Sequence, residues 1–475
     1  MELRPMQQAG IVAYPISLDV IREKVSNGRK RKRPNTLNLL SDYETQNNVK
    51  TIVNEFHEKI VRVEGDIPVQ LPVKKGDRFL FISYDQTAFT HGLHKYPAKF
   101  FPELPRWLIK RYSRENDLIL DPFSGSGTVN VEAILIKRNS VGVDVDPFSR
   151  FISEVKTTPL PIDELEHAQK KLLNLATKFD FSKVKGKDIP EFPYRDNWFN
   201  QEIIFELAYI KKIIKALKIN EETKNYFLIN MSSIVRAVSN ADDNCTRTVI
   251  RKKLNKQIFP GDALTKFVER ILINTPKMIQ FSELAPKRIK TKFPDTSDAR
   301  SIGFPDQTFD FAVTSPPYVN AVDYPRTHQL ESYWLELASG SLTPLKKRHV
   351  GTESVILKDY QYRHRIGEKQ ADKVIGKIYS VDKRRAYIAY KYLLDMRKNF
   401  EETYRVLKKG ARYAVVVGNN KIRGNLFESW KYLMEIAEQV GFSVETYFGS
   451  EIIKHFIKVP RKERINTDWI LILKR

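Results

Sequence analysis

The sequence has few of the features that would place a protein outside the cell or across a membrane. Cys245 is the single cysteine in 475 residues, so no internal disulfide can form, which fits a reducing compartment. No run approaches the roughly 20 apolar residues that a membrane-spanning helix requires. The first residues also lack the apolar core of a secretion signal. We therefore expect a cytoplasmic protein.

Metal-ligand spacing is absent too, and acidic residues are the minority charge. The eight histidines are scattered through the chain, so we expect no metal site. The 57 Asp and Glu residues face 80 Lys and Arg residues, which leaves a formal net charge of +23. Such an excess attracts a polyanion, most commonly nucleic acid. Charge alone carries no sequence information, and a surface that is basic only for solubility is the alternative.

The hydrophobic fraction of 41% and the aromatic fraction of 11% indicate a globular protein. A chain of this length is expected to form two or three packed units. The pattern divides the chain into four segments. A mixed leader over 1–85 carries the basic run 28–34 and is a candidate for DNA contact, and an alternating helix–strand part follows over 86–160. A mainly helical insertion over 161–290 is a candidate for target recognition, and a second alternating part over 291–475 contains a polar insertion near 342–385.

The alternating parts predict an α/β fold. Short apolar runs that end in acidic or turn residues are typical of buried parallel strands, and one strand–helix–strand unit is the beginning of a doubly wound, Rossmann-like sheet. We expect strands at 118–120, 140–145, 309–313 and 412–417, an edge strand at 468–473, and helices at 104–112, 129–137, 394–407 and 427–440.

A glycine-rich turn, Asp121-Pro122-Phe123-Ser124-Gly125-Ser126-Gly127-Thr128, follows the first strand. Glycines allow the backbone to approach a ligand closely, and on glycine spacing alone a dinucleotide or phosphate loop is an alternative. However, the Gly-Lys-Ser/Thr of a P-loop is absent, and Asp121 would repel a pyrophosphate. A carboxylate at a strand end suits a cationic ligand, such as a sulfonium cofactor with an α-amino group.

Two further acids follow in order along the chain. Asp144, with Val145 beside it, comes at the end of the next strand, where a carboxylate can accept hydrogen bonds from both ribose hydroxyls of a nucleoside. A surface turn would explain Asp146-Pro147 but not Asp144. Asp298-Ala299 precedes the strand at 309–313, and its carboxylate is expected to accept an adenine amine.

Thr314-Ser315-Pro316-Pro317-Tyr318 follows that strand at its carboxyl end, where open α/β sheets bind their ligands. The Ser315 hydroxyl and the Pro316 carbonyl can accept the hydrogens of a planar amine and orient its lone pair. Two prolines stiffen the loop, and Tyr318 can stack on a base that has been turned out of a duplex. The alternative is a Pro-Pro turn capped by a serine.

These motifs resemble those of the DNA amino-methyltransferases, which use S-adenosylmethionine to make N4-methylcytosine or N6-methyladenine, usually in restriction–modification systems. Residues 121–128 are similar to the cofactor motif I, and 314–318 to the catalytic motif IV. Residues 91–100 are similar to motif X, in which Lys99 is expected to meet the methionine carboxylate. The resemblance covers 91–150 and roughly 295–475. Lys409-Gly410-Ala411 departs from the family's Pro-Gly-Gly.

The resemblance implies S-adenosylmethionine as the cofactor and two sets of site residues. The catalytic set is Ser315, Pro316, Pro317 and Tyr318. The cofactor set is Lys99, Asp121, Pro122, Phe123, Gly125, Ser126, Gly127, Thr128, Asp144, Val145, Asp298, Ala299 and Thr314.

Serine in the catalytic loop favours cytosine N4, because adenine-specific relatives mostly carry Asp or Asn there. We therefore expect a site-specific methyltransferase for double-stranded DNA that protects it from a separate cognate restriction endonuclease. Adenine N6, an RNA amine, a non-catalytic DNA-binding partner and a dinucleotide-dependent oxidoreductase are the alternatives. Chemistry at cytosine C5 requires a nucleophilic thiolate, and Cys245 lies far from the loop.

Two segments are candidates for DNA contact. Residues 231–253 mix donors for phosphates and base edges, among them Arg236, Arg247 and Arg251; a solvated helix face is the alternative. Tyr324, Arg326 and His328 follow the catalytic loop closely enough to line a base pocket or to contact the DNA backbone, with core packing as the alternative.

Overall fold

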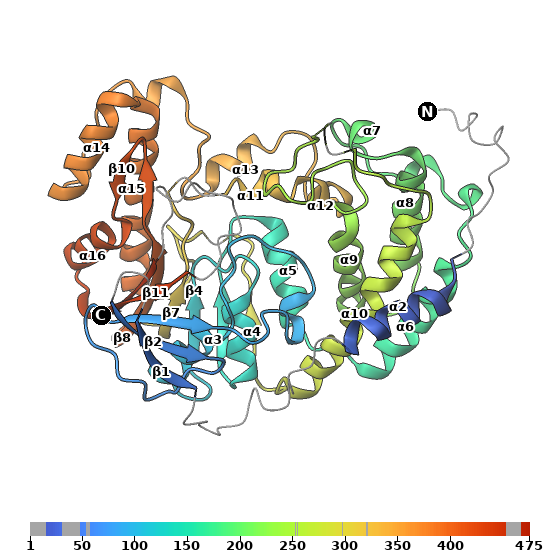
Figure 1. Cartoon of the computed structure of the whole chain (residues 1–475), viewed down its shortest axis with the longest axis horizontal. Helices are drawn as coiled ribbons and strands as arrows, with labels where there is room; N and C mark the ends of the chain where they lie inside the picture. The colour runs from blue at the N-terminus through green and yellow to red at the C-terminus, as the bar shows by residue number, and fades with distance from the viewer. Residues whose placement is uncertain are drawn as a thin grey trace.

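Ten strands form one sheet at the centre of the computed structural model, which describes residues 16–30, 48–53, 58–251, 253, 255–296, 298–319, 322–452 and 467–475. Figure 1 shows this sheet and its covering helices on one side of the molecule and a bundle of helices on the other. The basic run at 28–34 reaches outside the described residues after Lys30, and its side chains are not described.

The sheet has five neighbouring parallel strands, β8-β7-β4-β5-β6, and β12 lies antiparallel against β8. Its order is β1 (Val49–Val53), β2 (Lys59–Glu64), β3 (Arg78–Ile82), β11 (Ser443–Glu451), β12 (Thr467–Lys474), β8 (Leu407–Gly418), β7 (Phe309–Thr314), β4 (Leu118–Asp121), β5 (Asn139–Gly142) and β6 (Thr291–Lys292).

Helices cover both faces of the sheet, which explains why its central strands are apolar without alternation. In β4, Ile119 and Leu120 are both fully buried but belong to different clusters. Ile119 packs on the face covered by α3 (Glu103–Tyr112) and α4 (Thr128–Leu135), and Leu120 on the opposite face. That opposite face is covered by α14 (Lys369–Val381), α15 (Lys383–Val406) and α16 (Ser429–Val440).

The order of the strands reverses between β4 and β7. From β4 the chain continues to β5 and β6 on one side, whereas from β7 it continues to β8 on the other. Ile119 pairs with Phe311 and Leu120 with Ala312, so the two strands run side by side at this point. Open α/β sheets bind ligands outside the carboxyl ends of the strands at such a reversal.

The helical insertion forms a bundle with its own apolar core. The carboxylate of Glu206 accepts hydrogen bonds from the backbone N–H groups of Gly261 and Ala263. It thereby pairs N–H groups that would otherwise lack a partner at the N-terminus of α10, the longest helix of the bundle. The helices that contribute to this core are α2 (Leu18–Lys30), α5 (Pro147–Thr157), α6 (Ile162–Ala176), α8 (Gln201–Lys215), α9 (Glu221–Val235), α10 (Asp262–Leu284) and α12 (Gln329–Trp334), and one face of α4 packs against them.

Short elements complete the described chain: α7 (Arg195–Trp198), α11 (Tyr324–Thr327), α13 (Thr343–Arg348), the 3-10 helices η2 (Phe89–Gly92), η3 (Phe181–Lys183), η4 (Gly186–Asp188) and η6 (Leu357–Tyr360), and the hairpin strands β9 (Asn420–Ile422) and β10 (Asn425–Phe427). Within this part, no helix is long and apolar enough to cross a membrane.

The structure confirms the α/β class and the helical character of 161–290, and it corrects several boundaries. The strand expected at the sheet edge, 468–473, lies between β11 and β8, because β12 pairs with both. The leader is not separate from the sheet, since β3 pairs with β11 and β2 with β3. The strand expected at 140–145 ends at Gly142, and the helix expected at 394–407 begins at Lys383.

A buried charge network holds α4, which follows the glycine turn. Glu132 on α4 is fully buried, and its carboxylate accepts Arg106 Nε of α3 at 2.6 Å and His91 Nε2 at 2.7 Å. Burial lowers the pKa of His91 to about 4, so the ring is neutral near pH 7 and donates through Nε2–H. Arg106 also reaches Asp66 of the leader. The network therefore joins the leader, α3 and α4.

Glu132→Ala should lower the free energy of unfolding by about 3–5 kcal/mol, because it leaves the buried Arg106 cation with only the half-exposed Asp66 as a partner. Urea unfolding measured by fluorescence checks this. Glu115→Ala is the matched control: it removes an exposed pair with Lys137 and should cost about 0–1 kcal/mol. Equal costs for both variants would contradict the structural role of the network.

Candidate active site

The glycine turn leaves β4 and enters α4 through two left-handed residues. Gly125 has a φ of +49° and Gly127 a φ of +70°, conformations that side chains rarely adopt. A Cβ at Gly127 would also lie 2.9 Å from the Ser153 side chain. Ser153 Oγ donates to the Gly125 carbonyl at 3.0 Å, and the buried Lys156 Nζ donates to the Ser126 carbonyl at 2.9 Å. The turn is therefore held from α5 as well as from its own strand.

Asp121 joins this turn to the catalytic loop. Its buried carboxylate accepts the Thr314 hydroxyl at 2.6 Å, from the last residue of the neighbouring strand β7, and the Phe123 N–H at 3.1 Å. Burial raises the pKa of Asp121 to about 7, the two hydrogen bonds oppose this rise, and the carboxylate of Asp144 adds to it. A cation placed beside Asp121 would stabilise its charged form.

Asp144 receives two backbone N–H groups at the end of β5. One of its carboxylate oxygens accepts Gly125 N–H at 3.0 Å, and the other accepts Asp146 N–H at 2.8 Å. Burial and the nearby Asp146 raise the pKa of Asp144 to about 6. These bonds hold the carboxylate against the glycine turn.

The turn, Asp144 and the end of β7 surround one open cavity. Ser124, Ser126 and Thr128 line this cavity, and their hydroxyl oxygens are buried with no hydrogen-bond partner in the described part of the chain. Buried hydroxyls without partners are costly, so the cavity is built for a polar ligand that satisfies them.

The catalytic loop lies at one wall of the cavity. Ser315 and Pro317 line it, whereas Pro316 is buried behind it. Among the described residues, the Ser315 hydroxyl has no hydrogen-bond partner. Tyr318 lies beside the cavity: its hydroxyl donates to Asp468 of β12 at 2.7 Å, and its ring contacts Gly418.

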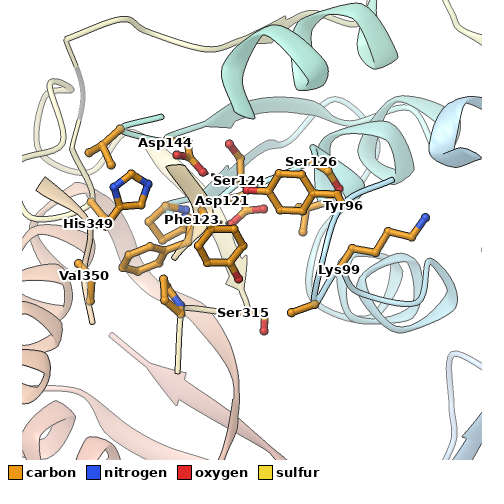
Figure 2. Close-up of a pocket in the computed structure, with 18 of the residues that line it drawn as sticks. Tyr96, Lys99, Asp121, Phe123, Ser124, Ser126, Asp144, Ser315, His349 and Val350 are labelled. Atoms are coloured by element: carbon orange, nitrogen blue, oxygen red, sulfur yellow. Dashed lines mark hydrogen bonds between the residues drawn. The ribbon is translucent and has the colours of Figure 1, made fainter. Parts of the chain in front are cut away.

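Charged residues from distant parts of the chain face the cavity at its two ends. Figure 2 shows Lys99 and Tyr96 on one side, with His349 and Val350 on the other, close to Asp144. Lys99 Nζ donates to the carbonyls of Gln86 and His91, at 3.2 and 3.1 Å. Burial and the nearby Lys277 lower the pKa of Lys99.

Asp298 also lines the cavity, but its carboxylate is held by Arg300. The Arg300 Nε and Nη2 groups lie 2.9 and 2.8 Å from its two oxygens. Burial raises the pKa of Asp298, but the paired guanidinium outweighs it, so the net shift is downward. An adenine amine would therefore share these oxygens with Arg300.

Most of the expected cofactor residues meet around this cavity. Those that line it are Lys99, Asp121, Pro122, Phe123, Gly125, Ser126, Thr128, Asp144, Val145, Asp298 and Ala299. Gly127 and Thr314 do not line the cavity themselves, but each is next in the chain to a residue that does. Sequence reasoning missed the lining residues Tyr96, Ala98, Phe100, Ser124, Val129, Arg348, His349 and Val350. The first five lie in or next to the recognised motifs, whereas 348–350 carry no signal in the sequence.

The residues expected to contact DNA separate into two kinds. Tyr324 lines the cavity, and its ring stacks on Tyr96 with centroids 5.7 Å apart. His328 is 3% exposed and stacks on the other side of Tyr96, so it belongs to the core. Arg236 is turned toward its own loop, where its guanidinium donates to the carbonyls of Asp242, Cys245, Thr246 and Arg247. Arg326 is half-buried, and Arg247 and Arg251 are exposed.

Known proteins are similar to this chain over most of its length. A DNA methylase family model matches residues 14–153, and an RMKL-like methyltransferase domain model matches residues 95–276. The type II methyltransferase M.MvaI of Kocuria varians is 27% identical over 72% of this chain and 80% of its own length. The type II methyltransferase M.BsoBI of Geobacillus stearothermophilus is 25% identical over 82% of this chain and 86% of its own.

The chain is similar to the DNA amino-methyltransferases, over residues 14–153 in the family model and over most of its length in these relatives. Among solved structures, an rRNA methyltransferase from Streptomyces viridochromogenes is 10% identical over 80% of this methyltransferase and 88% of that chain, with a TM-score of 0.29. An S-adenosylmethionine-dependent methyltransferase from Methanosarcina mazei is 11% identical over 80% of this chain and 98% of its own, with a TM-score of 0.28.

The similarity to DNA methylases identifies S-adenosylmethionine as the cofactor, and the cavity fits it chemically. Asp121 offers a carboxylate to a cation, Asp144 offers acceptors to ribose hydroxyls, and the three unpartnered hydroxyls offer further hydrogen bonds. No group of three or more His, Cys, Asp or Glu residues able to hold a metal occurs in the described part of the chain.

Cofactor binding should release protons from Asp121 near neutral pH. A group with a pKa of about 7 is half-protonated at pH 7, and a bound sulfonium favours its charged form. Affinity should therefore rise as the pH increases through 7, with release of up to about half a proton per site at pH 7. Calorimetry in buffers of different ionisation enthalpy measures this release.

Asp121→Asn should bind the cofactor more weakly and lose this proton release, while its amide oxygen still accepts the Thr314 hydroxyl. S-adenosylhomocysteine, which lacks the sulfonium charge, should release fewer protons from the wild-type protein. Equal release in Asp121→Asn and the wild type would assign the titration to another group.

Proposed function

We propose that this DNA methyltransferase transfers a methyl group to the N4 amine of a cytosine turned out of double-stranded DNA, as the protective modification enzyme of a restriction–modification system. The observation that carries the proposal is the unpartnered Ser315 hydroxyl, which lines the cofactor cavity at the end of β7. The similarity to type II methyltransferases from two bacteria supports the restriction–modification role.

Ser315 and Pro316 would position the amine that receives the methyl group. The cofactor supplies an activated methyl group when bound. The Ser315 hydroxyl oxygen and the Pro316 carbonyl accept the two hydrogens of the amine and orient its lone pair toward the cavity. Pro317 fixes this geometry, so that the rate comes from placement and from preorganised dipoles.

Two aromatic side chains are available to stack on the target base. Tyr318 directly follows the two prolines, and its hydroxyl is anchored on Asp468. Tyr324 lines the cavity and is supported from behind by Tyr96. A base outside the duplex needs such a replacement for the stacking that it loses.

The loop at 241–251 is our candidate for target recognition. The Arg236 guanidinium donates to carbonyls of this loop. The buried Thr248 hydroxyl donates to the Thr327 carbonyl at 2.9 Å, and Thr327 lies on the segment that follows the catalytic loop. The loop thereby presents the exposed Arg247 and Arg251 close to the segment that carries Tyr324. Phosphate and base-edge contacts both use such guanidinium groups.

Incubation with labelled S-adenosylmethionine and unmethylated DNA should yield N4-methylcytosine, identified by mass spectrometry of the nucleosides. N6-methyladenine would overturn the proposed base, because the same machinery would then act on adenine. Label in RNA, with none in DNA, would overturn the proposed substrate.

Ser315→Ala is the matched variant for this experiment. It should lower kcat by about 10²- to 10³-fold, the usual effect of removing one preorganised hydrogen-bonding group, and leave the dissociation constant of the cofactor unchanged. An equal loss of cofactor binding and turnover would assign Ser315 to the cofactor site instead.

Arg247→Ala should weaken DNA binding and reduce the slope of log affinity against log salt by about 1, because one phosphate contact is lost. Fluorescence anisotropy with a labelled duplex at several salt concentrations measures this slope. Lys171→Ala, at an exposed position on α6, is the control and should leave both quantities unchanged. If Arg247→Ala behaves like this control, the loop does not contact DNA.

A further inference from the structure

The polar insertion near 342–385 contributes a wall of the cofactor cavity through Arg348, His349 and Val350, which lie at and after the end of α13. Three contacts fix this segment, which we define as residues 343–350. Lys346 pairs with Asp323 at 2.9 Å, Arg300 donates to the Arg348 carbonyl at 2.7 Å, and His349 Nε2 lies 3.7 Å from Asp146 Oδ2. The partners come from the segment after the catalytic loop, the Asp298 turn and the end of β5.

The hydrogen bonds of His349 determine its charge. Its Nδ1 lies 2.9 Å from the Leu345 carbonyl, which can only accept, so Nδ1 carries a hydrogen. In the neutral ring the Nε2 lone pair would then face the Asp146 carboxylate at 3.7 Å. Both Nε2 and Asp146 Oδ2 are buried and have no hydrogen-bond partner in the described chain. Only the doubly protonated ring makes this contact attractive.

Asp146 gives the imidazolium a fixed partner. Its other oxygen accepts the Phe148 N–H at 2.9 Å and caps α5, so the side chain cannot turn away without loss of the cap. Its backbone N–H is bound by Asp144, whose carboxylate lines the cavity. Asp144 and Asp146 therefore place two carboxylates close together, and the His349 ring lies near Asp144 (Figure 2) and 3.7 Å from Asp146 Oδ2.

We propose that His349, as an imidazolium paired with Asp146, is a cofactor-binding residue that holds the segment 343–350 over the end of the cavity lined by Asp144. It balances the charge of Asp146, so that Asp144 can accept ribose hydroxyls beside a neutralised neighbour. The proposal rests on S-adenosylmethionine occupying this cavity. It gives the insertion a role in cofactor binding.

The other charged groups around His349 are compatible with its positive charge. Burial lowers the pKa of His349, but Asp146 and Asp144 outweigh it, and the net shift is above the ordinary value. Lys346 is already paired with Asp323, and Arg300 with Asp298. On the far side of Asp146, burial lowers the pKa of His328 to about 3, so that ring is neutral. Arg348 is exposed and points to solvent or ligand from the same segment.

The test compares wild type with His349→Gln, which is neutral at every pH. S-adenosylhomocysteine is the probe, since it has the same adenosine end without the sulfonium charge, and calorimetry gives its dissociation constant from pH 6 to 9. His349→Gln should bind roughly tenfold more weakly at pH 6, the effect of one lost contact to a charged group. The difference should disappear as the pH rises through the raised pKa of His349, where the wild-type ring loses its charge.

Two further variants serve as controls. Asp121 titrates in both proteins, so the ratio of the two dissociation constants reports on His349 together with the two carboxylates beside it, Asp144 and Asp146. His364→Gln changes a histidine in the same insertion that stacks on Tyr390 and should match wild type. Asp146→Asn keeps an oxygen for the α5 cap, and it should remove most of the pH dependence that His349 causes.

Ring carbon signals of labelled histidine, assigned with His349→Gln, give the charge of His349 in the ligand-free protein. A pKa above the ordinary value is expected, and a neutral ring at pH 6 would overturn the proposal. Binding by His349→Gln that equals wild type at every pH would also overturn it. Wild-type protein that binds no S-adenosylhomocysteine at any pH would instead overturn the cofactor site itself.

Discussion

The hydrogen bond from the Thr314 hydroxyl to the Asp121 carboxylate joins the two halves of the candidate active site. Asp121 ends β4 and begins the glycine turn, whereas Thr314 ends β7 and begins the Ser-Pro-Pro-Tyr loop. Almost 200 residues lie between them in the chain, yet strand pairing brings them within 2.6 Å. In the proposed reaction, the donor and the acceptor of the methyl group are both positioned by the centre of a parallel sheet that is buried on both faces.

The groups around the cavity lower the stability of the ligand-free protein, and a bound ligand offsets this loss. The carboxylates of the buried Asp121 and the half-buried Asp144 face it with raised pKa values, and three buried hydroxyls around them have no partner in the described chain. Each of these groups lowers the stability of the empty protein. A cationic, polyhydroxylated ligand satisfies them together, so the arrangement makes sense as a binding site and not as a packed interior.

The sequence predicts the parts of the site that are local. The glycine turn, the acid that ends the next strand and the Ser-Pro-Pro-Tyr loop each have a pattern over a few neighbouring residues, and the structure brings Asp121, Asp144 and Ser315 around one cavity. Features set by long-range pairing were missed. Nothing local distinguishes an edge strand from β12, which is inserted antiparallel between β8 and β11. The partner that charges His349, Asp146, lies about 200 residues away in the chain. Arg236 resembles a DNA ligand in the sequence, but its guanidinium binds the carbonyls of its own loop.

The position of β12 has a consequence for synthesis of the protein on the ribosome. β4 and the cofactor turn emerge early, but β8 cannot be covered on its outer edge until residues 467–474 have left the exit tunnel. Until then an apolar strand edge is open to other chains, a state that favours aggregation. Closure of the sheet therefore waits for β12, which follows β8 and β11 in the chain. A tag or fusion that strains β12 would act between two strands in the middle of the sheet.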